Sequence, residues 1–173
     1  VLAAQPAWAD HGQPSIETAF KVAEQAGLDL AKARQDMEKP GMQALLQQAA
    51  LHERQGRLPE AVALYERLLK QWPALPNTWY NLALLQRRLG RFEQALASYQ
   101  QALNRNVEQP EEVHLNRSVI YSDGLHQPDA AERELQAALT LNPHYVPALL
   151  NLGNLHEDLG RRDAALASYE RLL

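Results

Sequence analysis

The sequence contains no cysteine among its 173 residues. This absence excludes disulfide bonds, a thiolate nucleophile and a cysteine-based zinc site. Aromatic residues are scarce, at 6% of the chain, and no stretch reaches the roughly 18 to 20 apolar residues that a membrane-spanning helix needs. Basic residues are not in excess either, because the chain has 17 Lys and Arg but 21 Asp and Glu. We therefore expect no membrane span and no nucleic-acid partner.

Hydrophobic residues make up 46% of the chain, which is enough for one folded domain with a sizeable core. Ala, Leu, Gln, Glu and Arg dominate the composition, and these residue types are favourable in helices. The composition therefore predicts an all-α protein.

The first nine residues resemble the end of a bacterial signal peptide. Ala7 and Ala9 have the spacing of a cleavage signal before Asp10, although the basic start and most of the apolar run are missing. The alternative is a flexible N-terminus rich in Ala and Pro. We assign residues 1–14 to one of these two, so both a cytoplasmic and a periplasmic or exported location stay open.

A short motif recurs along the chain. Gly-Arg begins residues 56–61, 90–95 and 160–165; each copy ends in Ala, and a Tyr follows four residues later. A diverged copy occupies residues 122–131, between the second copy and the third. The first two copies lie 34 residues apart, a period typical of stacked helical repeats. We assign four repeats to residues 42–75, 76–110, 111–145 and 146–173, the last one truncated.

Each repeat is predicted to consist of two helices joined by a tight turn. Gly56, Gly90 and Gly160 stand where the first helix would end in the left-handed conformation, and Pro59 and Pro128 fall in the first turn of the second helix. Small residues at matching positions would let the two helices approach closely. They are Ala49, Ala83, Ser118 and Gly153 on the first helices, and Ala61, Ala95, Ala131 and Ala165 on the second.

Residues 15–41 do not fit the repeat and are assigned to N-terminal capping helices. Ser15 is a good N-cap, and apolar stripes follow it until Pro40 and Gly41, which we expect to halt the second helix. Such a pair would cover the apolar face of the first repeat, as a solenoid requires. The fourth repeat stops inside its second helix, which predicts a longer native chain.

The repeated positions resemble the pattern of a known family, the tetratricopeptide repeat. The matching positions are Trp79, Leu82, Ala83, Ala95 and Tyr99 in the second repeat, and Leu152, Gly153, Ala165 and Tyr169 in the fourth. The resemblance implies a right-handed superhelix, an α–α solenoid, in which the first helices line a concave groove. It implies a non-catalytic scaffold that binds a peptide segment of a partner protein in that groove. Departures from the family pattern are Gln48, Arg117, Val107 and Leu125.

The sixth position of the first helices carries an amide in every repeat, namely Gln47, Asn81, Asn116 and Asn151. An amide donates and accepts hydrogen bonds, as is needed to hold the peptide groups of an extended chain. The series resembles the asparagine ladder in the repeat domain of the O-linked N-acetylglucosamine transferase; the alternative is local bonding of a consensus residue. The other residues expected on this face are Tyr80, Leu84, Arg87, Arg88, Leu115, Val119, Leu150 and Asn154.

Charges on the same face predict a direction for the bound segment. Arg87 and Arg88 make a positive spot, and Glu157 and Asp158 make a negative one further along. A segment with an acidic end near the second repeat and a basic end near the fourth would be complementary. The alternative is ordinary solvated surface charge. Leu46 stands where chaperone-binding members of the family carry Lys, so chaperone C-termini are not the expected ligand.

No catalytic constellation is visible, and the six histidines lack metal-ligand spacing, so we expect no cofactor, no metal and no catalysis within these residues. Two alternatives stay open. Residues 110–169 resemble repeat regions fused to sulfotransferase-like domains, in which case the chain is the N-terminal regulatory or substrate-docking region of a larger bacterial enzyme. Self-assembly into a homo-oligomer through Leu166, Tyr169, Leu172 and Leu173 is the other.

Overall fold

A computed structural model describes residues 30–173 of the chain, with side chains from Lys39 onward. These residues form helices and no strand, which confirms the predicted all-α class. Residues 49–173 make one compact unit, separate from the residues before them. In chain order the helices are α2 (Leu30–Arg54), α3 (Leu58–Gln71), α4 (Pro76–Arg88), α5 (Phe92–Asn104), α6 (Pro110–Val119), the short π-helix η1 (Ile120–Gly124), α7 (Pro128–Leu141), α8 (Val146–Asp158) and α9 (Arg162–Glu170).

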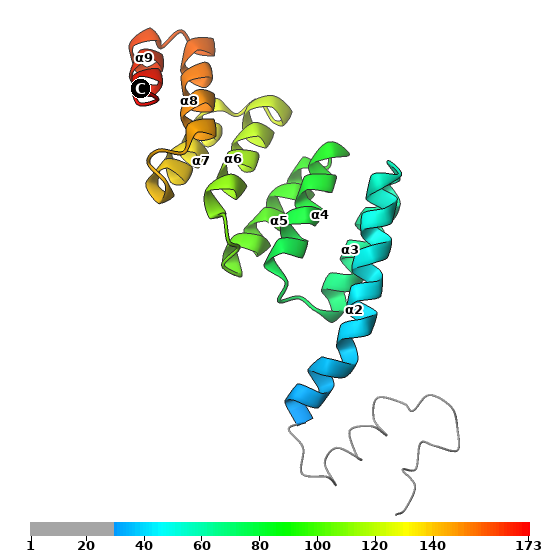
Figure 1. Ribbon diagram of the computed structural model, residues 1–173. Coiled ribbons are helices and arrows are strands. Elements are labelled where there is room, and N and C mark those ends of the chain that lie inside the picture. Colours follow the sequence, from blue (N-terminus) through cyan, green and yellow to red (C-terminus); the bar gives the residue numbers. More distant parts are fainter. Residues whose placement is uncertain (1–29) are drawn as a thin grey trace, which may run out of the picture. The chain divides into compact units, whose positions relative to one another are not determined.

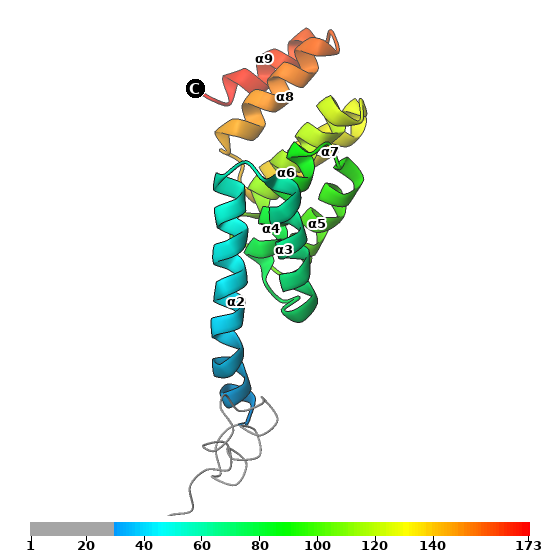
Figure 2. The same cartoon turned by 90° about the vertical axis from the view of Figure 1, so that its right-hand side faces the viewer.

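From α4 onward the helices form successive antiparallel pairs: α4 with α5, α6 with α7, and α8 with α9 (Figure 1). Each second helix also packs against the first helix of the next pair, α5 against α6 and α7 against α8. The same stacking is seen from the side in Figure 2. This arrangement is the predicted α–α solenoid.

Glycine follows α2, α4 and α8, as predicted. Gly56, Gly90 and Gly160 have φ angles of 72°, 72° and 71°, in the left-handed region that glycine adopts without steric cost. At the end of α4, the N–H of Gly90 bonds to the carbonyl of Arg87 and that of Arg91 to the carbonyl of Gln86, which is the Schellman arrangement. Proline lies in the first turn of two of the second helices, as Pro59 of α3 and Pro128 of α7.

The two helices of each pair meet at small buried residues. Ala49, Ala83 and Ser118 are almost fully buried on the first helices, and Ala95 and Tyr99 of α5 belong to the same apolar cluster as Ala83. The closest approach is at Gly153 on α8. A Cβ atom at that position would lie 2.2 Å from Cε1 of Tyr169 on α9, a distance that van der Waals radii forbid.

The turn between α6 and α7 differs from the others, because the chain carries an extra residue in this turn. The residues of η1 adopt a π-helical turn, with the N–H of Leu125 bonded to the carbonyl of Ile120 at 2.9 Å. Leu125 stands where the other turns have glycine, and it is His126 that takes a positive φ of 53°. The π-helix thus accommodates the insertion without breaking the pairing of α6 with α7.

The contacts of Arg117 show why this position can depart from the family pattern. Its guanidinium on α6 bonds to Glu134 of α7 at 3.0 Å and to Gln100 of α5 at 2.8 Å. Burial raises the pKa of Glu134, but the hydrogen bond from His114 and the charge of Arg117 outweigh it, so the pKa lies below its ordinary value. A charged residue therefore links three helices at a position where the family usually has Leu.

A second ion-pair group holds the other side of α7. Glu132 accepts hydrogen bonds from Nε2 of His156 on α8, at 2.8 Å, and from Arg161 in the following turn, at 2.9 Å. The hydrogen bond from His156 lowers the pKa of Glu132 against the opposing effect of burial, and Arg161 adds to the lowering. Both neighbours of α7 are thus fixed to it by carboxylates.

One predicted boundary is wrong. Pro40 and Gly41 do not halt a helix, because α2 continues through them from Leu30 to Arg54. Proline removes one backbone hydrogen bond, at a cost of about 3 kcal/mol, but good helix formers on both sides carry the helix across the gap. Residues 1–29, with the predicted signal-peptide remnant and first capping helix, lie outside the described residues, and the cap itself stays a prediction.

The contact between Gly153 and Tyr169 generates a stability prediction. Gly153→Ala should destabilise the chain by about 1–3 kcal/mol, because the added methyl group overlaps the tyrosine ring. In a Tyr169→Ala background the same substitution should be neutral or stabilising, since Ala is favoured over Gly in a helix by about 1 kcal/mol. Urea unfolding of the four proteins measures both effects, and an equal loss in the two backgrounds would contradict the packing argument.

Candidate interaction surface

The predicted amides lie on successive first helices. Asn81 is on α4, Asn116 on α6 and Asn151 on α8, and each side chain is partly buried. Gln47 is exposed on α2, but it precedes Ala49 and so lies in the other unit. The three asparagines and their neighbours on α4, α6 and α8 are called the first-helix face below.

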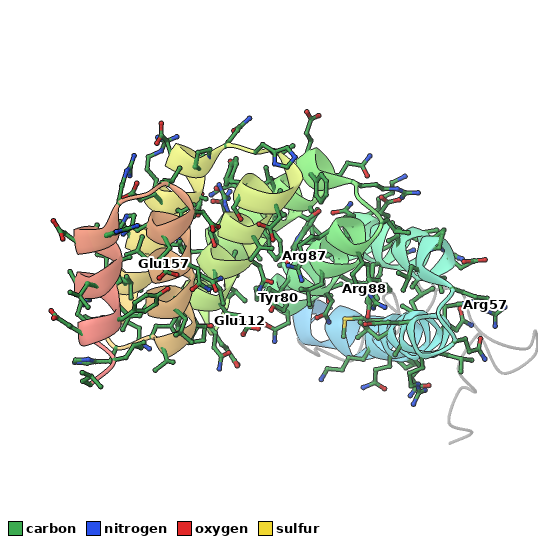
Figure 3. The ribbon with its side chains drawn as sticks, turned by 90° about the horizontal axis from the view of Figure 1, so that it is seen from above. Arg57, Tyr80, Arg87, Arg88, Glu112 and Glu157 are labelled. Atoms are coloured by element: carbon green, nitrogen blue, oxygen red, sulfur yellow. The ribbon has the colours of Figure 1, made fainter. Side chains whose placement is uncertain are left out.

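A pocket of about 330 Å³ lies between α4 and α6 and is called the α4–α6 pocket. Asn81 and Tyr80 line it together with Glu112. The hydroxyl of Tyr80 donates to Oε1 of Glu112 at 2.6 Å, across the two helices, and Figure 3 shows these two side chains next to each other. Burial, followed by this hydrogen bond, raises the pKa of Tyr80 well above its ordinary value. The phenol therefore stays a hydrogen-bond donor at higher pH than an ordinary tyrosine does.

The three amides differ in what they contact. Nδ2 of Asn116 donates to the carbonyl of Glu112 at 2.9 Å and to the hydroxyl of Tyr80 at 3.3 Å, so its donors are used within the chain. In the part of the chain with described side chains, Asn81 and Asn151 make no side-chain hydrogen bond. The local-bonding alternative thus applies to Asn116, while two amides keep both donors and acceptors available.

A second pocket, of about 260 Å³, lies between α6 and α8 and is called the α6–α8 pocket. It contains three residues that the sequence placed on this face, namely Val119, Asn151 and Asn154. The other residues that line it are Ser118, Ser122, Asp123, Ala131, Leu135, Leu155 and Asp158. Ser122 and Asp123 were missed from the sequence, because the π-helical turn that brings them to the pocket was not predicted.

The apolar residues predicted on the face have two different roles. Leu84 and Leu115 are partly buried. Leu84 packs against an apolar cluster that includes residues of α4 and α5, and Leu115 packs against one formed by α7 and α8, so both belong largely to the core. Leu150 on α8 is 42% exposed and is open to a partner. Figure 3 shows the cations Arg87 and Arg88 on α4. Arg88 is exposed and Arg87 is partly buried, and neither forms an ion pair with another described residue.

Two tyrosines at the same repeat position, Tyr169 and Tyr99, differ in whether the hydroxyl has a hydrogen-bond partner. The hydroxyl of Tyr169 on α9 has Oδ1 of Asn154 at 2.8 Å and Oε2 of Glu157 at 3.1 Å as acceptors. The hydroxyl of Tyr99 on α5 is buried without a hydrogen-bond partner among the described residues, because Leu84 and Arg87 occupy the matching positions and offer no acceptor. Burial raises the pKa of Tyr99 well above its ordinary value.

Two histidines, His114 and His156, form hydrogen bonds with carboxylates of α7. His114 bonds to Glu134 at 2.7 Å and His156 to Glu132 at 2.8 Å. Across the described residues, the His, Asp and Glu side chains form no group of three that would hold a metal ion. No helix within residues 30–173 is both long and apolar enough to cross a membrane.

Comparison with known proteins identifies related sequences. Two family models, both described as tetratricopeptide repeat, match residues 42–105 and 124–173. The cytochrome c-type biogenesis protein CycH of Bradyrhizobium diazoefficiens is 31% identical over 119 residues, which are 68% of this chain and 32% of that protein. The chain therefore spans about a third of the length of this relative.

Solved structures show the same fold. MamA is 16% identical, with a TM-score of 0.69 over 88% of this chain and 91% of that one. The first tetratricopeptide repeat domain of Spaghetti (RPAP3), solved with the HSP90 peptide SRMEEVD, is 21% identical, with a TM-score of 0.60 over 69% of this chain and 93% of that one. At these identities the likeness concerns the fold alone.

The contrast between the two tyrosines predicts opposite effects of removing the hydroxyl. Tyr99→Phe should stabilise the chain by about 1 kcal/mol, because a buried donor without a partner carries a desolvation cost of about 1–3 kcal/mol. Tyr169→Phe should lower stability, since it removes a donor from two acceptors. Thermal and urea unfolding of both variants test this, and destabilisation by Tyr99→Phe would show that its hydroxyl is paired.

Proposed function

This chain belongs to the tetratricopeptide repeat family, and we propose that it is a non-catalytic scaffold whose first-helix face binds a peptide segment of a partner protein. The observation that carries this proposal is the pair of amides, Asn81 and Asn151, which line two pockets and make no hydrogen bond within the described side chains. Each amide offers a donor and an acceptor to the backbone of a docked segment.

The proposed mechanism is rigid presentation. Helix packing fixes α4, α6 and α8 before the partner arrives, so the scaffold loses little conformational entropy on binding. Asn81 and Asn151 bond to peptide groups at two separate points, and Asn116 contributes its carbonyl oxygen, because its donors are already used. Exposed Leu150 adds apolar contact area. The partner is a protein or peptide segment in an extended or helical conformation.

The charges on the face set the direction of the segment. Arg87 and Arg88 on α4 attract an acidic group, while Glu157 and Asp158 at the end of α8 attract a basic one. Glu157 already accepts from Tyr169, so Asp158 is the freer of the two carboxylates. Exposed charges of this kind act mainly on the association rate and on orientation.

The peptide seen with the Spaghetti domain helps to narrow the ligand class. That domain was solved with an HSP90 peptide, and the family's chaperone-binding members use Lys and Asn at two positions of the first repeat. This chain has Leu46 and Ala50 there. Binding of a chaperone C-terminus is therefore not part of the proposal.

The relative CycH favours a second candidate, a scaffold role in cytochrome c-type biogenesis. The identity of 31% extends over most of the repeats, but the chain spans only a third of that protein. Deleting the coding region for residues 42–173 in the source organism and staining its proteins for covalently attached haem tests the candidate. Loss of c-type cytochromes supports it, and unchanged amounts exclude it. Self-assembly and fusion to an enzyme stay predictions.

The amide hypothesis predicts a specific loss of binding. Combined Asn81→Ala, Asn116→Ala and Asn151→Ala substitutions should weaken binding of a peptide selected from an array by roughly tenfold or more, because each hydrogen bond contributes about 0.5–1.5 kcal/mol. Helicity and melting temperature should change little, since two of the amides make no bond within the described part of the chain. Calorimetric titration measures the affinity.

A matched control removes three amides from second helices. The control combines Gln71→Ala, Gln94→Ala and Gln136→Ala. These glutamines lie on α3, α5 and α7 and are all exposed, so this triple variant should bind as the unmodified chain does. Unaltered affinity in the asparagine variant, or an equal loss in both triple variants, would refute a role for the three asparagines.

A further inference from the structure

We propose that the α6–α8 pocket binds one basic side chain, Lys or Arg, of the protein segment that docks on the first-helix face. The proposal rests on the proposed function, because it concerns one contact within the docked segment. The pocket measures about 260 Å³, which is below the roughly 300–1,000 Å³ typical of small-molecule sites. Its size therefore suits a single side chain better than a separate ligand.

The charge of the lining selects a cation. Asp123 of η1 and Asp158 of α8 both line the pocket, and no basic residue among those described lines it. Asp123 accepts a hydrogen bond from the hydroxyl of Ser122 at 2.7 Å, and neither carboxylate forms an ion pair within the described side chains. Two negative charges thus line one pocket without a counter-ion among the described side chains.

The helix ends at the pocket also favour a cation. The pocket lies where η1 and α8 end, at Gly124 and Asp158 respectively. The carboxyl end of a helix carries a partial negative charge, which attracts cations. The π-helical turn at η1 arises from the extra residue of the third repeat, and it is this turn that supplies Ser122 and Asp123 to the lining. Such turns occur often at functional sites.

The remaining lining residues match the stem and the head of a long basic side chain. Val119, Leu135 and Leu155 give apolar contact for methylene groups. The amide oxygens of Asn151 and Asn154 accept hydrogen bonds from an ammonium or guanidinium group, and the oxygen of Asn154 retains a second lone pair beside its bond from Tyr169. A metal ion fits poorly, because no third His, Asp or Glu joins the two carboxylates within the described residues.

The proposal is tested with an array of immobilised random-sequence peptides and the full 173-residue chain. Bound peptides should be enriched in Lys or Arg at one position relative to their common frame. A selected binder is then synthesised with its basic residue unchanged or replaced by norleucine, which keeps the methylene groups and removes the charge. The replacement should weaken binding to the unmodified chain about fivefold, the upper range for a partly exposed ion pair.

The matching protein variants carry Asp123→Asn and Asp158→Asn, which keep the shape of both side chains. In this double variant the lysine and norleucine peptides should bind within about a factor of two of each other, because the variant lacks the partners of the charge. The control is Glu66→Gln with Glu170→Gln, an equal change of net charge at two exposed positions outside the pocket. It should preserve the fivefold preference.

Each outcome decides one of the two proposals. Bound peptides without a basic preference, or a preference that survives Asp123→Asn with Asp158→Asn, would overturn the basic-side-chain pocket and leave the scaffold function in place. A preference lost equally in the Glu66 and Glu170 control would also overturn it, since overall charge would then be the cause. If the unmodified chain binds no peptide of the array, the scaffold function itself fails.

Discussion

Close approach of two helices at a small residue is the constraint on which this structure depends. Every first helix with described side chains carries Ala, Ser or Gly where it meets its partner, and the ring of Tyr169 occupies the volume that a larger residue than Gly153 would need. Short interaxial distances bury apolar surface efficiently in a chain with few aromatic residues. One helix pair alone could not bury its outer flank, so the pairs stack.

Stacking has a consequence for the surface. Second helices pack against the first helices of the next pair, and α7 is bonded to both of its neighbours through Glu132 and Glu134. Several side chains of α4, α6 and α8 that are left outside the core, Asn81 and Asn151 among them, line two pockets. A rigid stack thus offers polar groups at repeating intervals, which suits a long and flexible ligand better than a compact one.

The sequence predicted the features that local chemistry determines. The left-handed glycines follow from a 34-residue recurrence and from the steric freedom of glycine alone. The predicted helix end at Pro40 was wrong, because proline indicates only a local free-energy cost to the helix. It does not show whether the flanking helix formers outweigh that cost. The hydrogen bonds of Asn116 were also out of reach, since Tyr80 lies 36 residues earlier and only the stacking of repeats brings the two together. Asp123 was missed for a similar reason: counting detects an extra residue but does not show where the backbone absorbs it.

The central claim is that the first helices, and not the second, carry the binding face. Backbone amide NMR of the isotopically labelled chain, titrated with an array-selected peptide, tests this claim most directly. The account predicts that the shifted resonances cluster on α4, α6 and α8, around Asn81, Val119 and Asn151. Shifts concentrated on α5, α7 and α9 would contradict it.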